Sequence, residues 1–99
     1  MEIEVIITPT AQLSFEKIKD YLLTLFTYKE YSRLLKELEK VVKLLKKGNV
    51  HFKYSYKTNT YKVVLHKLCS MYYKKVSDEQ IDIVLFIDNR MMKGKENYE

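Results

Sequence analysis

The hydrophobic residues of this 99-residue chain repeat with two different periods, and the change falls at Gly48. Before Gly48, apolar residues recur at helical spacing, which predicts amphipathic helices over residues 9–26 and 28–47. After Gly48 the pattern alternates, which is typical of strands with one buried face. An apolar run at residues 3–7 predicts a further strand before the helices. The strands that the alternation predicts cover residues 51–57, 61–67, 69–76 and 81–88.

The ends of the predicted helices carry typical capping residues. Thr8 precedes Pro9, as an N-cap precedes a proline at the first helical position. Gly48 follows the second helix, where it predicts a left-handed C-cap. The last strand is apolar on both sides, as expected for an interior strand. We expect one of its faces to carry Ile81, Ile83, Leu85 and Ile87, and the other to carry Val84 and Phe86.

The order of these elements is one strand, two helices and then four strands. Helices grouped before a run of strands predict an α+β fold with two layers. Because the connection between the helices is short, we expect a helical hairpin packed on a mainly antiparallel sheet. The length of the chain is that of one domain. We assign residues 1–92 to this domain and the polar residues 93–99 to a flexible C-terminal tail.

The composition excludes several kinds of chemistry. One Cys, two Gly and one Pro are too few for a disulfide, a cysteine-based zinc site or a Gly-rich phosphate loop. We therefore expect no metal and no cofactor. The acidic N-terminus does not resemble a signal peptide, and no apolar run is long enough to cross a membrane. A cytoplasmic protein without membrane contacts is the resulting expectation.

The net charge of +5 conceals an uneven distribution along the chain. Residues 1–39 carry −2 and residues 76–99 carry −3, whereas residues 40–75 contain ten lysines and no acidic residue. Such a stretch predicts a surface that attracts a polyanion or an acidic protein, although a solvated face without a partner is the alternative. Five tyrosines in this stretch are either exposed for stacking on bases or half-buried as ordinary strand residues. They are Tyr54, Tyr56, Tyr61, Tyr72 and Tyr73.

Few residues offer catalytic chemistry. Cys69 falls on a predicted strand, which is typical of a small buried thiol. His51 and His66 lack a third metal ligand, and His66 is either a general acid or base or an ordinary surface strand residue. No carboxylate pair occurs in residues 40–75, which argues against glycosidase or two-metal chemistry. Arg90 follows the last strand, where it either stabilises charge on a phosphodiester or forms a surface ion pair.

Several of these segments, taken in order, resemble the RelE/ParE toxin superfamily. The element order and the start of the first helix are similar, but the more specific part is the C-terminal half. That half combines a strand with tyrosine, a hairpin with aspartate and a final strand that ends in an arginine. The resemblance covers about residues 3–92. The residues that carry it are Thr8–Ala11, Phe15, Ile18, Tyr61–Leu65, Ser70–Val76, Asp78, Ile81, Ile83 and Phe86–Arg90.

The resemblance implies the toxin of a type II toxin–antitoxin system, which inhibits growth until a cognate antitoxin protein binds it. Members of the superfamily either cleave mRNA on the ribosome, without a metal ion, or inhibit DNA gyrase without catalysis. Ser70 stands where the nucleases carry an arginine, so a degenerate, inactive toxin is a third interpretation.

The resemblance also implies a set of site residues. The nucleases of the superfamily use basic residues on the middle strands, an arginine after the last strand and a C-terminal tyrosine or histidine. For mRNA cleavage the resemblance therefore implies Lys53 and Lys57 on the strands, Arg90 after the last strand and Tyr98 near the C-terminus. Together with the charge pattern, it predicts a target-binding surface formed by Lys62, Lys67, Lys74, Lys75 and Tyr72.

Overall fold

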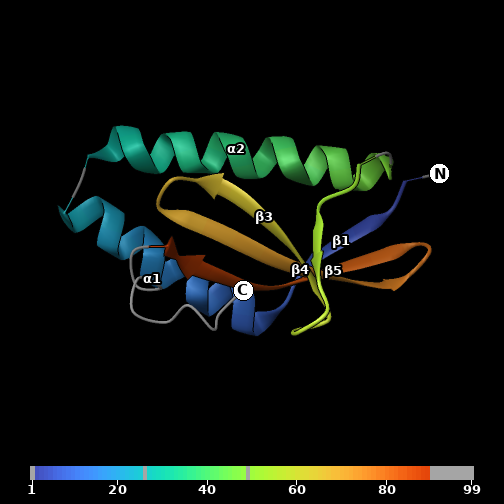
Figure 1. The fold of residues 1–99 in the computed structure, drawn as a ribbon. Coiled ribbons are helices and arrows are strands. Elements are labelled where there is room, and N and C mark those ends of the chain that lie inside the picture. Colours follow the sequence, from blue (N-terminus) through green and yellow to red (C-terminus); the bar gives the residue numbers. More distant parts are fainter. Residues whose placement is uncertain (1, 26, 49, 90–99) are drawn as a thin grey trace.

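A computed structural model describes residues 2–25, 27–48 and 50–89 of the chain. Within these residues, two helices lie against a five-stranded sheet (Figure 1), which confirms the predicted α+β class and the order of elements. The proposed tail at residues 93–99 lies outside the described residues. The elements are β1 (Glu4–Ile7), α1 (Pro9–Leu25), α2 (Tyr28–Lys47), β2 (Lys53–Ser55), β3 (Thr60–His66), β4 (Cys69–Ser77) and β5 (Gln80–Asp88).

The sheet is mainly antiparallel, as predicted. Its strands lie in the order β1-β5-β4-β3-β2, with β1 parallel to β5 and the other neighbours antiparallel. β2 covers Lys53–Ser55 and is shorter than the predicted strand at residues 51–57. It lies at the edge of the sheet, where a strand has a partner on one side and pairs over a shorter length.

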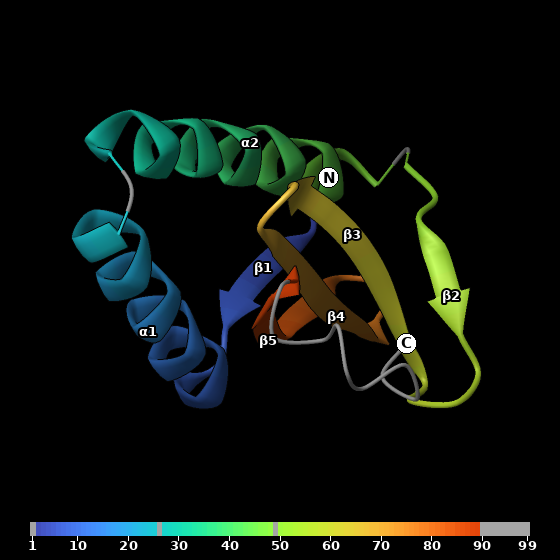
Figure 2. The same ribbon diagram turned by 60° about the vertical axis from the view of Figure 1, so that its left-hand side comes forward.

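The two helices meet at their short connection and diverge from it (Figures 1 and 2). α1 packs mainly against β5, whereas α2 packs mainly against β3 and α1 and to a lesser extent against β1. Because neighbouring strands of a sheet are twisted relative to one another, helices that follow different strands point in different directions. The helical hairpin is therefore splayed. No helix in the described part of the chain combines the length and the apolar character needed to cross a membrane.

Thr8 joins three elements at the start of α1. Its Oγ1 accepts a hydrogen bond from the Ala11 N–H (3.2 Å), which confirms the predicted N-cap. The same hydroxyl donates to the Ile83 carbonyl oxygen on β5 (2.9 Å), and the Thr8 N–H donates to that oxygen as well (3.1 Å). At the other end of the helical segment, Gly48 has a φ of 76°, which confirms the predicted left-handed C-cap.

A β-bulge in β5 changes which of its side chains face the helices. The residues on either side of Val84 lie opposite Tyr72 and Tyr73, so Val84 itself has no partner on β4. An extra residue shifts the alternation by one position, and Phe86 therefore enters the core beside Phe15. The faces predicted for the second half of the strand are wrong for Leu85, Phe86 and Ile87.

The core lies between the helices and the sheet. Its buried side chains come from one stripe of each helix, as the periodicity predicted, and from alternate positions of β3, β4 and β5. The helical members are Ala11, Phe15, Ile18, Leu22, Leu34, Val41 and Leu45. We call the opposite side of the sheet the outer face, and it carries Lys53, Lys62, Val64, Ser70, Tyr72, Lys74 and Leu85.

Candidate functional site

A row of side chains crosses the outer face through four neighbouring strands. Lys53 on β2 lies opposite Lys62 on β3, and Lys62 lies opposite Tyr72 on β4. Leu85 on β5 lies opposite Tyr72 and completes the row. Residues directly opposite each other share a face of the sheet and contact one another. The row therefore brings together three of the residues that the sequence assigned to the site.

Two positive charges face each other in this row, and we call Lys53 and Lys62 the lysine pair. Like charges directly opposite each other destabilise a sheet. Neither lysine forms an ion pair with a described residue. Lys53 is exposed and Lys62 is half-buried. A bound anion would offset the repulsion between them, so the lysine pair is suited to a phosphate group.

Two further lysines of the predicted site border the row. Lys74 follows Tyr72 by two positions on β4, so it points to the same face, where it lies opposite Asp82. Lys57 lies in the turn between β2 and β3, next to Thr58. Both are exposed, but the charge of Lys74 faces the Asp82 carboxylate, so Lys57 contributes more of the positive charge near the lysine pair.

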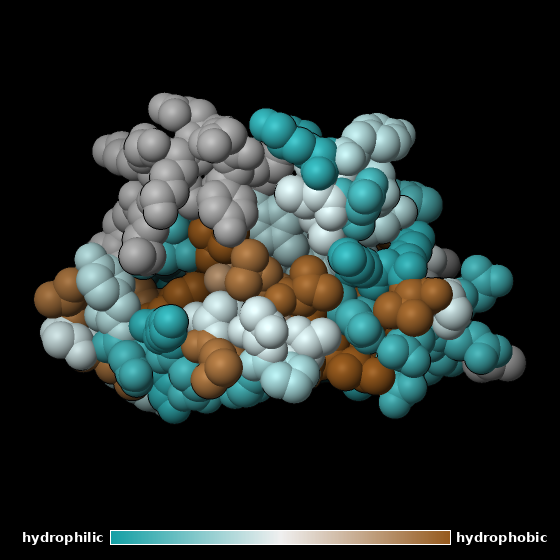
Figure 3. Space-filling model, turned by 90° about the horizontal axis from the view of Figure 1, so that it is seen from below, coloured by the Kyte–Doolittle hydropathy of each residue, from teal (hydrophilic) through white to brown (hydrophobic). Residues whose placement is uncertain are grey.

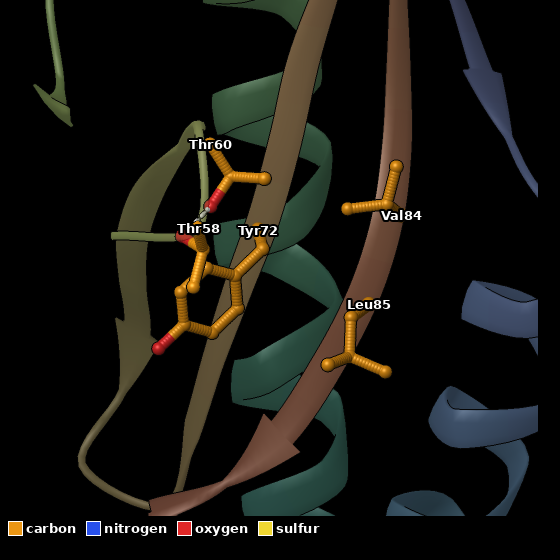
Figure 4. A pocket seen from close by; sticks show the side chains of 5 residues that line it. All are labelled: Thr58, Thr60, Tyr72, Val84 and Leu85. Carbon is orange, nitrogen blue, oxygen red and sulfur yellow. Dashed lines mark hydrogen bonds between the residues drawn. The ribbon is translucent and has the colours of Figure 1, made fainter. Parts of the chain in front are cut away.

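A pocket of about 80 Å³ opens on the outer face beside the row (Figure 4). The two threonine side chains of its lining are hydrogen-bonded to each other, with the hydroxyl oxygens of Thr58 and Thr60 2.6 Å apart. Tyr72 directs its hydroxyl away from Leu85, so ring carbons and aliphatic groups form much of the wall. The pocket is suited to a small apolar or planar group next to a bound anion. It is lined by Thr58, Thr60, Tyr72, Val84 and Leu85.

The side of the molecule opposite α2 carries a band of hydrophobic side chains between hydrophilic ones (Figure 3). Val64, on the outer face, is 63% exposed. Lysines beside apolar surface suit a ligand with both anionic and nonpolar parts, as in a single nucleic-acid strand.

Most tyrosines of the lysine-rich stretch do not lie on the outer face. Tyr54, Tyr61 and Tyr73 lie opposite one another on the helix side of the sheet, and neighbouring ring centroids are 4.9 Å apart. Lys75 is also on that side, with its Nζ 5.3 Å from the centroid of the Tyr61 ring. Tyr72 lies on the outer face but is only 3% exposed, so its ring is not accessible for stacking on a base.

Burial lowers the acidity of two groups on the helix side of the sheet. It raises the pKa of the Cys69 thiol to about 12, and the Asp88 carboxylate adds to the shift. It also raises the pKa of the Tyr73 hydroxyl to about 12, with a smaller contribution from Tyr61. Cys69 therefore stays protonated and unreactive near neutral pH, which confirms its interpretation as a small buried thiol.

His66 connects β3 to α2 and does not face the outer side. Its Nδ1 accepts a hydrogen bond from the Leu68 N–H (3.1 Å), so Nδ1 carries no proton. The proton of the neutral ring lies on Nε2, which donates to the Glu30 carboxylate (2.9 Å). The side chain is 11% exposed, and both ring nitrogens are occupied. His66 therefore connects β3 to α2 through its hydrogen bonds. It is neither an ordinary surface residue nor available as an acid or base.

The remaining predicted residues are not part of the row. Lys67 lies in the turn between β3 and β4, at the opposite end of β3 from Lys57. Arg90 and Tyr98 lie outside the described residues. Four lysines of the lysine-rich stretch belong to α2, so this stretch is divided between two sides of the molecule. They are Lys40, Lys43, Lys46 and Lys47.

A groove of about 340 Å³ lies between α2 and the end of β1. Apolar side chains of both elements form most of its surface, and two lysines and one glutamate border it. The groove carries a local excess of positive charge beside apolar surface, which suits an acidic segment with apolar side chains. Its lining residues are Ile7, Leu38, Glu39, Val42, Lys43 and Lys46.

Sequence reasoning missed both the groove and the pocket. A signal for the groove was present, because Leu38 and Val42 widen the apolar stripe of α2 beyond the width that one strand covers. No pattern indicated the pocket, because its wall depends on the bulge at Val84, which arises from pairing between distant segments.

Within residues 2–25, 27–48 and 50–89, no three His, Cys, Asp or Glu side chains are grouped so that they could hold a metal ion. A comparison of the chain with models of known protein families found no match, and a comparison with curated proteins found none either. The outer face offers fixed positive charge, hydroxyl groups and a small apolar pocket in one area.

Proposed function

We propose that this chain is the toxin of a type II toxin–antitoxin system, and that it arrests growth in the cytoplasm by cleaving mRNA on the ribosome. The observation that carries the proposal is the lysine pair beside the pocket on the outer face. The resemblance of residues 3–92 to the RelE/ParE superfamily supports the same function. The lysine pair is suited to an anion, and a phosphodiester chain supplies anionic groups at regular intervals.

An RNA strand would bind along the row in two ways at once. Lys53 and Lys62 neutralise phosphates, and the pocket receives part of the neighbouring base or ribose. Lys57, in the turn next to Thr60, adds positive charge at the end of the row where the pocket opens. Because Tyr72 is buried, binding depends on charge and on the pocket more than on stacking.

Cleavage of the bound strand needs no metal ion. One group must take the proton of the 2′-hydroxyl as its oxygen attacks phosphorus, and another must return a proton to the departing 5′-oxygen. Positive charge must also stabilise the developing phosphorane. In the proposal, Lys57 and Tyr98 serve the proton transfers, and Arg90 and Lys53 stabilise the charge.

The groove between α2 and β1 supports the proposed antitoxin partner. Ile7, Leu38 and Val42 offer apolar contacts, and Lys43 and Lys46 attract acidic side chains. An acidic segment with apolar residues on one side fits this combination. We propose that such a segment of the antitoxin binds there.

Inhibition of DNA gyrase is the second candidate function, and one observation favours it. The imidazole of His66 is occupied by Leu68 and Glu30, and Tyr72 is buried, so neither is available for proton transfer. A protein that only binds its target needs lysines but no acid or base.

Expression of the chain, with primer extension on ribosome-associated mRNA, tests the proposal. We expect growth arrest and new mRNA ends. A variant with Lys53→Gln and Lys62→Gln should cut at least about tenfold more slowly, because each lost phosphate contact weakens RNA binding and lowers its salt dependence by about one charge. A matched control with Lys40→Gln and Lys47→Gln on α2 should cut like the wild type.

Other results of this experiment would contradict the proposal. Growth arrest with intact mRNA and inhibited supercoiling by purified gyrase would establish the second candidate instead. No arrest at all would mean an inactive toxin. Equal losses in the two double variants would show that the lysine pair is not the RNA site.

A further inference from the structure

A series of tyrosine rings lies on the helix side of the sheet, where the proposed function makes no use of them. Tyr61 stacks on Tyr73, with ring planes 11° apart and centroids 4.9 Å apart. Tyr54 packs edge-on against Tyr61 at 4.9 Å, and Tyr56 packs edge-on against Tyr54 at 4.8 Å. We call these four residues the tyrosine cluster. It runs from β4 across β3 and β2 to the turn that follows β2.

The tyrosine cluster becomes more exposed towards the edge of the sheet. Tyr73 is completely buried, Tyr54 and Tyr61 are half-buried, and Tyr56 is 86% exposed. In the described part of the chain, neither helix packs extensively against β2, which β3 and β4 separate from β5 and α1 (Figure 2). The end of the cluster at β2 therefore faces solvent.

Tyr56 is exposed, but its ring is not isolated. A single exposed apolar side chain is common on protein surfaces, whereas Tyr56 rests against the ring of Tyr54. The Tyr54 hydroxyl in turn donates a hydrogen bond to Oδ1 of Asn59 in the same turn (3.4 Å). Side chains that are already held in place lose less conformational freedom when a ligand packs on them. The exposed end of the cluster is therefore prepared for a planar ligand.

The surroundings of the tyrosine cluster are positively charged. Lys75 is exposed and places its Nζ 5.3 Å from the centroid of the Tyr61 ring. Lys57 directly follows Tyr56, and residues 40–75 contain no acidic side chain. Aromatic rings beside lysines are the combination with which proteins bind single-stranded nucleic acid, because the rings stack on bases while the lysines pair with phosphates.

We propose that the tyrosine cluster is a second contact for single-stranded RNA, on the opposite side of the sheet from the lysine pair. Tyr56 stacks on a base, and Lys75 contacts a neighbouring phosphate. An acidic peptide would complement the lysine but leave the tyrosine ring without a planar partner, so RNA is the better occupant. The inference relies on the proposed function only for the choice of RNA as the ligand, since stacking needs no catalytic group.

The affinity for a 2′-O-methylated oligouridine of about ten nucleotides, measured by fluorescence anisotropy, tests the inference. The methyl groups prevent attack by the 2′-oxygen, so the strand stays intact. Tyr56→Ala should raise Kd at least about fivefold, because it removes one stacking contact. Tyr56→Phe keeps the ring and should bind within about twofold of the wild type. Lys75→Gln should weaken binding and lower its salt dependence by about one charge.

Tyr28→Ala is the matched control on the protein. Tyr28 is 70% exposed and also packs edge-on against a neighbouring tyrosine, at 6.2 Å. It lies at the start of α2, whose Glu30 is bonded to His66 at the opposite end of β3 from Tyr61. We expect its Kd to equal that of the wild type. Equal losses in Tyr28→Ala and Tyr56→Ala would overturn the inference.

An abasic strand of the same length is the matched control on the ligand. It keeps the phosphates but lacks the bases, so Tyr56→Ala should not weaken its binding. An equal loss of affinity for both strands would show that the contact is not stacking and would overturn the inference. A wild type that does not bind the oligouridine would overturn it as well.

Tyrosine fluorescence gives a second readout, since the chain contains nine tyrosines and no tryptophan. A base stacked on Tyr56 quenches the emission of that residue. The oligouridine should therefore quench a smaller fraction of the emission in Tyr56→Phe than in the wild type, although the two bind equally well. The same quenched fraction in both proteins would overturn the inference.

The inference and the proposed function can fail separately. If the wild type neither arrests growth nor cuts mRNA, the proposed function fails, and the Kd values still decide whether the tyrosine cluster binds RNA. If mRNA is cut but Tyr56→Ala binds the oligouridine like the wild type, the inference fails and the proposed function stands. Tighter binding of a glutamate-rich peptide than of the oligouridine, lost in Tyr56→Ala, would assign the cluster to a protein partner and overturn the inference.

Discussion

At the scale of single residues, two buried acids make the stability of the fold depend on alkaline pH. In the unfolded chain the Cys69 thiol and the Tyr73 hydroxyl titrate near their ordinary pKa values of 9.0 and 10.0. In the folded chain burial raises both pKa values to about 12. Between these values the folded state binds more protons than the unfolded state, so the free energy of unfolding must fall as the pH rises.

We expect the full free energy of unfolding below about pH 9 and a progressive loss up to about pH 12, with a slope of at most about 1.4 kcal/mol per pH unit for each titrating group. Denaturant titrations over a pH series measure this slope. Cys69→Ala is the control, because only the loss due to Tyr73 remains and the fall should begin about one pH unit higher. The same pH dependence in both proteins would contradict the assignment to Cys69.

At the scale of elements, the bulge in β5 decides which of two adjacent side chains supports the core. Phe86 is buried against Phe15, with ring centroids 4.9 Å apart, whereas Ile87 is half-buried on the outer side. Phe86→Ala should lower the free energy of unfolding by about 3–5 kcal/mol, because it leaves a cavity in the core. Ile87→Ala should cost clearly less. Urea denaturation of both variants compares them, and the reverse order would mean that β5 has no bulge at Val84.

The same strand shows how far the sequence could predict this fold. Thr8 and Gly48 were predicted correctly because a cap depends on residues next to it in the chain. The bulge at Val84 depends on pairing with β4, and the alternation of β5 alone could not reveal it. The splay of α1 and α2 has a similar origin, because it follows the twist of the assembled sheet.

The candidate site, like the fold, could be predicted from the sequence only in part. Alternation within β2 and β3 places Lys53 and Lys62 on polar faces, but their position opposite each other requires the register of the two strands. Lys75 was assigned to the same surface because of its charge, yet its contact with Tyr61 lies on the helix side of the sheet. Charge counts along a chain cannot distinguish the two faces of a strand.

At the scale of the whole molecule, the division of the lysines predicts two separate binding surfaces. The groove lies between α2 and β1, whereas the lysine pair lies on the outer face of the sheet. Lys43→Glu should weaken binding of the proposed acidic antitoxin at least about tenfold and leave RNA affinity within about twofold, because charge reversal acts mainly on the ligand in contact. Calorimetry with the antitoxin and fluorescence anisotropy with RNA measure the two affinities.

The substitution of the lysine pair is the reciprocal control, since it should weaken RNA binding and spare the antitoxin. A loss of both affinities in either variant would show that one continuous surface binds both partners.

The position of β1 also determines when the protein can complete its fold during synthesis. Within the described sheet, β1 has one neighbour, β5. Thr8, which follows β1, donates a hydrogen bond to the carbonyl oxygen of Ile83, far along the chain. β1 must therefore wait until β5 has been synthesised, since such distant pairing cannot form earlier. During that interval β1 and the apolar faces of both helices have no sheet to cover them. The described sheet is therefore complete only after β5 has been translated.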